Sequence, residues 1–229
     1  VTGGLEIADG LSHLYLRTNV PVPYLESGQS VRIDEPRYFV FSYGKPSDID
    51  SVASVQRALD LTIAGWRAWA KTCALPSFAD THVLRSALCL KLHAFADTGA
   101  IIAAATTSVP EALGTQRTWD YRYCWLRDAA FVVEALRRLS YLTEGEAFVS
   151  FLRDVAEEGP LQPVYGIGGE RTLPEHHLDH LAGFAGARPV RIGNAAYAQR
   201  QHDLMGEMIL CLETLMTDPR VVTDDGEAI

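Results

Sequence analysis

The spacing of apolar residues changes once along this chain of 229 residues, and the change falls at Gly44 and Pro46. Before that point, apolar and polar residues alternate over 11–17 and 31–34, and 38–43 is aromatic and β-branched, which is typical of β-strands. After it, apolar residues recur every three or four positions, which is typical of helices. Strands followed only by helices predict a β domain and then an α domain, not alternating βαβ units.

The helical part of the sequence contains five amphipathic segments and two long connections. The helices are expected at 52–73, 80–95, 127–139, 143–158 and 194–218. The fourth has a capping-box pattern at its start, formed by Thr143 and Glu146. The connections, 101–126 and 160–193, hold aromatic residues and paired charges. Because long loops in a compact domain are usually functional, we expect a site there.

Composition excludes some classes of partner. The chain has 20 basic and 29 acidic residues, which disfavours a broad electrostatic contact with nucleic acid. Its longest wholly apolar run is 100–105, far short of the ~18 residues that a membrane helix needs. Four scattered cysteines, with no Cys-x-x-Cys pair, favour buried free thiols in a reducing compartment over two disulfides. We therefore expect a cytoplasmic protein with neither a nucleic-acid nor a membrane partner.

The segment 119–128, with the sequence WDYRYCWLRD, is the most informative part of the chain. Four of the seven residues at 119–125 are aromatic, whereas the chain as a whole is 9% aromatic. A sugar pocket needs aromatic rings for the C–H faces of the sugar and charged planar groups for its hydroxyls, and this segment offers both. The alternative is a buried aromatic strand with an Arg–Asp ion pair at a helix start. The pattern alone leaves both interpretations open.

Four motifs extend this pattern: TTSVPE at 106–111, WDYRYCWLRD at 119–128, YGIGGER at 165–171 and RPVRIGNAA at 188–196. Together, and in this order, they resemble bacterial members of glycoside hydrolase family 15, which are glucoamylase-like and trehalase-like enzymes. The resemblance covers nearly the whole chain.

The resemblance implies a fold and a reaction. It assigns 1–47 to the C-terminal strands of a β-sandwich, 48–76 to a linker helix and 77–229 to the first part of an (α/α)6 barrel. It also implies inverting hydrolysis that releases glucose from the non-reducing end of an α-glucoside. The partner is then an oligosaccharide or disaccharide substrate, and no cofactor is implied.

The resemblance further implies a set of substrate-binding residues: Tyr121, Trp125, Arg127, Asp128, Gln201 and Asp203. The two aromatic residues would contact the sugar ring, and the arginine and aspartate at 127–128 would hydrogen-bond its hydroxyls. The pair at 201 and 203 would make further sugar contacts. Neighbouring residues point apart in a regular helix, so the pair at 127–128 is expected at an irregular helix start.

No catalytic residue is assigned to this chain. Inverting hydrolysis needs two carboxyl groups roughly 6.5–9.5 Å apart, one acting as acid and the other as base. The family's acid lies in a Trp-Glu segment and its base near the end of the barrel, and the sequence contains neither segment. Glu111, Glu170 and Glu175 match family positions that are not catalytic, so they are assigned structural roles. We therefore expect the isolated chain to be inactive.

Other functions stay open. The chain could be a truncated, non-catalytic sugar-binding relative, or a trehalase or sugar phosphorylase of the same architecture. The segment 175–180 contains three histidines and two acidic residues, which are potential zinc ligands, but it lacks the His-Glu-x-x-His order and is expected to be an ordinary loop. A partial barrel would leave apolar helix faces without partners, which predicts self-association through exposed barrel faces.

Overall fold

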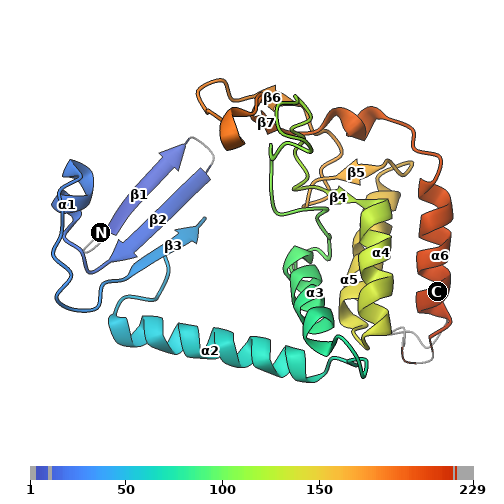
Figure 1. Ribbon diagram of the computed structural model, residues 1–229, viewed down its shortest axis with the longest axis horizontal. Helices are drawn as coiled ribbons and strands as arrows, with labels where there is room; N and C mark the ends of the chain where they lie inside the picture. The colour runs from blue at the N-terminus through green and yellow to red at the C-terminus, as the bar shows by residue number, and fades with distance from the viewer. Residues whose placement is uncertain (1–3, 10–11, 219, 221–229) are drawn as a thin grey trace. The chain divides into compact units, whose positions relative to one another are not determined.

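The computed structural model describes residues 4–9, 12–218 and 220. The chain divides into two compact units, 1–71 (unit 1) and 72–229 (unit 2) (Figure 1). Strands come first and most of the helical structure follows, as the change in apolar spacing predicts.

Unit 1 contains a three-stranded antiparallel sheet in the order β1-β2-β3. Its elements are β1 (Gly4–Asp9), β2 (Ser12–Thr18), α1 (Val22–Ser27), β3 (Phe39–Tyr43) and α2 (Val52–Lys71). The register pairs Leu16 of β2 with Leu5 on one side and Phe41 on the other, so these side chains share one face of the sheet. Alternation along each strand therefore makes this face apolar.

Two features of unit 1 differ from the sequence-based expectation. The strand expected at 31–34 is wrong, and the third strand is β1, at the start of the described chain. A four-residue alternation is a weak signal, and tertiary pairing overrides it. The sequence predicts no helix before residue 52, yet α1 begins at Val22 with a proline in its first turn. Proline is favoured there because the first helical N–H groups have no intrahelical acceptor.

Unit 2 is built around helices that pack side by side in Figure 1. They are α3 (Asp80–His93), α4 (Leu126–Arg138), α5 (Thr143–Glu157) and α6 (Leu204–Met216). Short elements lie at the end where α4 and α6 begin (Figure 1): β4 (Cys124–Trp125), β5 (Val164–Tyr165), β6 (His176–His177), η1 (Phe184–Gly186), β7 (Arg191–Ile192) and η2 (Ala195–Ala198). Antiparallel pairing joins β4 to β5 and β6 to β7.

One apolar core joins α4, α5 and α6. Its largest fully buried members include Phe148, Leu126, Met208 and Leu215, and Tyr165 of β5 is buried with them. Because β4 and β5 are attached to this core, the loop that precedes α4 has a fixed base.

The helices expected at 52–73, 80–95, 127–139 and 143–158 are confirmed to within a few residues. The capping box is wrong, because α5 has Leu142 at its N-cap and no side-chain hydrogen bond there. The fifth helix is also wrong as a single element, since η2 and α6 are separated by an irregular segment at 199–203. The side chain of Asn194 accepts a hydrogen bond from the backbone N–H of Ala196 and so starts a short separate turn.

The four cysteines form no disulfides, and Cys124 and Cys211 are the two that are buried. Burial raises the pKa of the Cys124 thiol to about 12 and that of Cys211 to about 11. Cys89 is exposed, which corrects the expectation of uniformly buried thiols. Within the described ranges, the helices are all too short or too polar to span a bilayer.

Candidate functional site

The predicted Arg–Asp pair lies in the first turn of α4. Arg127 and Asp128 follow the N-cap residue Trp125, whose backbone is still extended. The Arg127 Nη2 atom lies 3.3 Å from Asp128 Oδ2, so the two side chains meet although they are neighbours in sequence. Asp128 Oδ2 is shielded from solvent and has no aligned hydrogen-bond donor. This contact is therefore an ion pair with poor hydrogen-bond geometry.

Arg127 also contacts both predicted residues that precede α6. Its Nη1 atom donates to Gln201 Oε1 at 3.3 Å and to Asp203 Oδ2 at 3.0 Å. The hydrogen bond from Arg127 holds the pKa of the Asp203 carboxyl below its usual value. The structure thus brings the four predicted polar residues together around one guanidinium, across a separation of 76 positions in sequence.

The two predicted aromatic residues lie beside each other. The ring centroids of Tyr121 and Trp125 are 5.8 Å apart, and the ring planes are tilted by 51°. Trp125 is only 6% exposed and belongs to a small apolar cluster with Val164, Leu173 and Ala196. The packing interpretation of the segment therefore holds for most of the Trp125 ring, whereas Tyr121 is half-buried beside it.

The hydroxyl of Tyr121 has a carboxylate partner. It donates to Glu111 Oε1 at 2.8 Å, and the other carboxylate oxygen of Glu111 lies 2.8 Å from Arg117 Nε. Burial, followed by the hydrogen bond to Glu111, raises the pKa of Tyr121 to about 12. The phenol therefore keeps its proton at neutral pH and acts as a donor.

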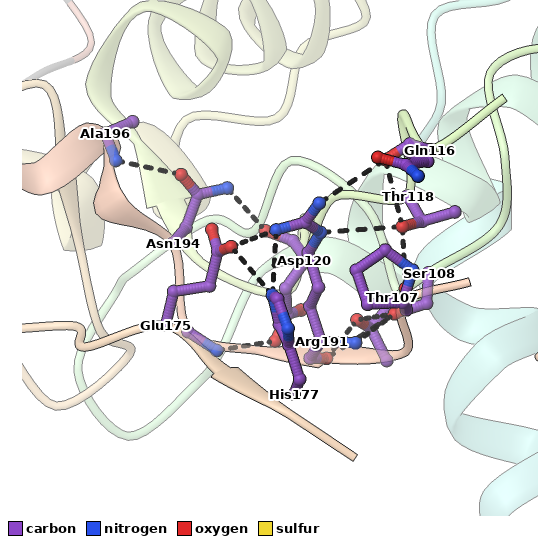
Figure 2. A network of polar contacts seen from close by, with 12 residues as sticks. Thr107, Ser108, Gln116, Thr118, Asp120, Glu175, His177, Arg191, Asn194 and Ala196 are labelled. Atoms are coloured by element: carbon purple, nitrogen blue, oxygen red, sulfur yellow. Dashed lines mark hydrogen bonds and ion pairs between the residues drawn. The ribbon is translucent and has the colours of Figure 1, made fainter. Parts of the chain in front are cut away.

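A fully buried carboxylate, Asp120, joins two loops (Figure 2). It accepts hydrogen bonds from Arg122 through Nε and Nη2, both at 2.9 Å, and through the backbone N–H at 3.2 Å. It also accepts one from the backbone N–H of Gly193 at 3.2 Å. The Asn194 side chain donates to the Asp120 carbonyl at 3.1 Å. These donors to the Asp120 carboxylate come from two segments far apart in sequence.

Arg191 forms the centre of the network drawn in Figure 2. Its guanidinium donates to Glu175 and to the Gln116 carbonyl, and it lies 4.6 Å from the centroid of the Trp119 ring. Its carbonyl accepts from Thr107 Oγ1 at 2.7 Å. These contacts attach the 107–119 loop to the hairpin formed by β6 and β7.

The histidine-rich segment takes part in this network. His177 Nε2 lies 3.3 Å from Arg191 Nη1 and 3.6 Å from Glu175 Oε1. In the part of the chain that the structure describes, His, Cys, Asp and Glu side chains do not gather in threes as a metal site would require.

Sequence reasoning did not single out Glu111, Asp120, Arg191 or Asn194 as contributors to the site. Each of them lies inside one of the four motifs, but their types and spacing fit many loops. The best local signal is Asp120, which stands between two aromatic residues and is therefore a candidate for burial. A buried carboxylate needs several hydrogen-bond donors, which predicts partners from elsewhere in the chain. Asp120 and Arg191 each also have a partner nearby in sequence. The contacts that join the loops, however, span 73 to 84 positions, so no local pattern identifies them.

Gly193 is expected to be required where the two loops meet. Its φ is +84°, and an added Cβ would lie within van der Waals overlap of the Pro174 carbonyl oxygen. Gly114 has a similar φ of +80° but open space around it. We expect Gly193→Ala to reduce the free energy of unfolding by about 1–2 kcal/mol more than Gly114→Ala, because only the first adds a clash to backbone strain. Urea unfolding measures both variants, and equal losses would contradict the steric argument.

The sequence was compared with known proteins, and it is similar to members of one family. The sequence model of Glycosyl hydrolases family 15 matches residues 77–228. A trehalase of Mycolicibacterium smegmatis is 46% identical over 154 residues, which cover 65% of this chain and 23% of the relative. A trehalase of Thermoplasma acidophilum is 37% identical over 179 residues, covering 78% and 30%. This chain thus spans less than a third of the length of these curated relatives. No solved structure matches it.

The matched range covers more than half of the chain and includes every residue of the site described above. It confirms the resemblance that the four motifs carry, and the trehalases are similar to this chain over most of its length. The chain therefore belongs to glycosyl hydrolase family 15.

Proposed function

We propose that this protein is a glycoside hydrolase of the trehalase type, and that the cluster around Arg127 binds one glucose unit of its disaccharide substrate. The observation that carries the proposal is the meeting of an aromatic pair with an Arg–Asp cluster at the starts of α4 and α6. The identity to proteins named trehalase supports this choice of substrate over a glucoamylase-type oligosaccharide.

Each side chain has a role that its chemistry supports. Tyr121 offers a ring face to the C–H groups of the sugar, and Trp125 adds the small part of its ring that stays exposed. A guanidinium and a carboxylate bind hydroxyls through charge-assisted hydrogen bonds. Asp128 supplies acceptors for hydroxyl protons, and Arg127 supplies donors. Gln201 and Asp203 contact Arg127 directly, which orients the guanidinium, and Asp203 keeps its second carboxylate oxygen for the sugar.

The proposal also assigns the described elements to the parts of a larger fold. The sheet of unit 1 would be the end of a β-sandwich, with 48–76 as a linker helix. The helices within 77–229 would be the first part of an (α/α)6 barrel. Family membership supports this arrangement, as does the order of strands before helices.

The proposed reaction is inverting hydrolysis, and its acid and base are not assigned to residues of this chain. A general acid needs a raised pKa, which neighbouring arginines oppose. The carboxylates near the cluster are paired with arginines: Glu111 with Arg117, Asp120 with Arg122, Asp128 and Asp203 with Arg127, and Glu175 with Arg191. This pairing suits binding and orientation rather than proton donation.

The same pairing favours a second candidate, a protein that binds sugar without hydrolysing it. A sugar phosphorylase of the same architecture is a third. Glucose release from trehalose supports the hydrolase, and saturable binding with no release supports the binding protein. Release of glucose 1-phosphate that requires inorganic phosphate supports the phosphorylase.

Sugar binding can be followed by fluorescence. In a background of Trp66→Phe and Trp69→Phe, both remaining tryptophans, Trp119 and Trp125, lie in unit 2. We expect saturable changes in their emission with trehalose and glucose, because Trp125 contacts Tyr121. Glycerol, which has hydroxyls but no ring, is the control. An emission that responds to all three in the same way, or to none, would rule out the proposed site.

A further inference from the structure

We propose that Glu111 is a positioning residue of the sugar site, and that it acts by holding the hydroxyl of Tyr121 so that Tyr121 meets the sugar with its ring face alone. This inference rests on the proposed function. It concerns a carboxylate that the sequence assigns to a merely structural role.

Each oxygen of the Glu111 carboxylate has its own partner. One accepts the proton of the Tyr121 hydroxyl at 2.8 Å, and the other faces Arg117 Nε at 2.8 Å. The phenol has a single proton to donate, so this proton is not free for a sugar oxygen. The contact with Arg117 also fixes the plane of the carboxylate, since a charge-assisted hydrogen bond is stronger and more directional than a neutral one.

The loop that carries Glu111 is itself attached at its base. The backbone N–H of Glu111 donates to the Arg117 carbonyl at 3.1 Å, and that of Ser108 donates to the Trp119 carbonyl at 3.0 Å. Thr118 Oγ1 donates to the Pro189 carbonyl at 2.7 Å. The loop is therefore paired along its two sides and joined to the segment before β7. These contacts restrain the loop and therefore the position of Glu111, which a positioning role requires.

The electrostatics of Tyr121 link Glu111 to the rest of the site. Burial, the hydrogen bond to Glu111 and the Glu111 charge all raise the pKa of the phenol, and the charge of Asp128 raises it further. Asp128 is thus close enough to Tyr121 for their charges to interact. Tyr121 therefore interacts with two carboxylates, with Glu111 through a hydrogen bond and with Asp128 through charge.

A purely structural ion pair between Glu111 and Arg117 is the competing explanation. Exposed pairs of this kind contribute little, and Glu111 retains a 33% exposed side chain. Loss of such a pair would change stability slightly and leave the affinity for sugar unchanged. Loss of a positioning contact would lower sugar affinity, and the loss would depend on the Tyr121 hydroxyl.

The test is a double-mutant cycle on sugar affinity, with Glu111→Ala, Tyr121→Phe and the double variant. The probes are glucose and trehalose, measured by the fluorescence titration above. We expect each single variant to weaken binding by about tenfold, the effect of one hydrogen bond to a charged group at its lower end. The double variant is expected to be no weaker than either single variant, because both remove the same contact. Effects that multiply, or a Glu111→Ala variant that binds as tightly as the parent, overturn the inference.

Two further variants sharpen the test. Glu111→Gln keeps an amide oxygen that can accept the phenol proton, so its affinity is expected to lie between those of the parent and Glu111→Ala. Glu170→Gln is the matched control, since Glu170 is an exposed loop carboxylate whose side chain accepts from the Gly168 backbone N–H. It is expected to leave affinity unchanged and to show no coupling to Tyr121→Phe.

Urea unfolding of the same variants distinguishes a failure of this inference from a failure of the proposed function. Coupling between positions 111 and 121 in stability but not in sugar affinity identifies a structural contact and overturns the inference alone. A parent protein that binds neither sugar removes the proposed function, and the inference falls with it. Coupling in both measurements supports the inference.

Discussion

Replacing Asp128 by alanine is expected to weaken the binding of glucose and trehalose by about 10- to 150-fold. A hydrogen bond to a charged group contributes about 1.5–3 kcal/mol, and each 1.4 kcal/mol is tenfold in affinity. Asp128 is 42% exposed, and its ion pair with Arg127 has poor hydrogen-bond geometry. Its removal therefore costs the fold little, and the loss is expected in ligand affinity. The fluorescence titration measures it.

The chain offers a matched control for this substitution. Arg153 and Asp154 form a second Arg-Asp pair of neighbours, within α5, with a separation of 4.0 Å and an aspartate that is 71% exposed. Asp154→Ala is expected to leave sugar affinity unchanged. An Asp128→Ala variant that binds sugar as tightly as Asp154→Ala would remove Asp128 from the binding site.

Asp120→Asn is expected to lower the free energy of unfolding of unit 2 by about 2–4 kcal/mol, although the two side chains have nearly the same shape. The four hydrogen bonds described at the Asp120 carboxylate all come from donors, on Arg122 and Gly193. An asparagine turns its NH2 group toward one of these donors, which leaves a buried polar clash in place of a hydrogen bond and removes the charge. Asparagine is therefore not a conservative replacement here.

The control for Asp120→Asn is Arg122→Gln, which removes the other side of the ion pair. Arg122 is 43% exposed, so its loss leaves the Asp120 carboxylate with backbone donors and with water nearby. We expect this variant to lose about half as much stability as Asp120→Asn or less. Urea unfolding in the background of Trp66→Phe and Trp69→Phe reports on unit 2 alone. If the two variants lose the same stability, the buried donors do not explain the role of Asp120.

Local sequence pattern predicted the helices well, because α2, α4 and α5 each carry a continuous apolar stripe. It failed where pairing between distant segments decides the structure. The strand β1 exists because Leu5 pairs beside Leu16, whereas the alternation at 31–34 has no partner strand. The break at 199–203 contains no glycine or proline, so no turn residue announces it.

The candidate site was predictable in part, and for two different reasons. The aromatic and Arg–Asp content of 119–128 was visible locally, whereas Gln201 and Asp203 were expected only from the family resemblance. Their contact with Arg127 spans 74 and 76 positions, and no periodicity encodes a distance of that kind. The contact between Glu111 and Tyr121 spans ten positions within one loop, which is too irregular for either the helical or the strand period to relate them.

The hydrogen bonds between the 107–119 loop and the segment 189–191 affect how the protein folds during synthesis. Thr118 and Thr107 find their partners at Pro189 and Arg191, 71 and 84 residues later in the chain. At ~5–20 residues per second, a ribosome needs several seconds to supply those partners after the threonines have emerged. During that interval the 107–119 loop has been synthesised, but its hydrogen-bond partners at 189–191 have not. The nascent chain therefore cannot complete this region before 189–191 has emerged, and until then the loop is open to a chaperone or a protease.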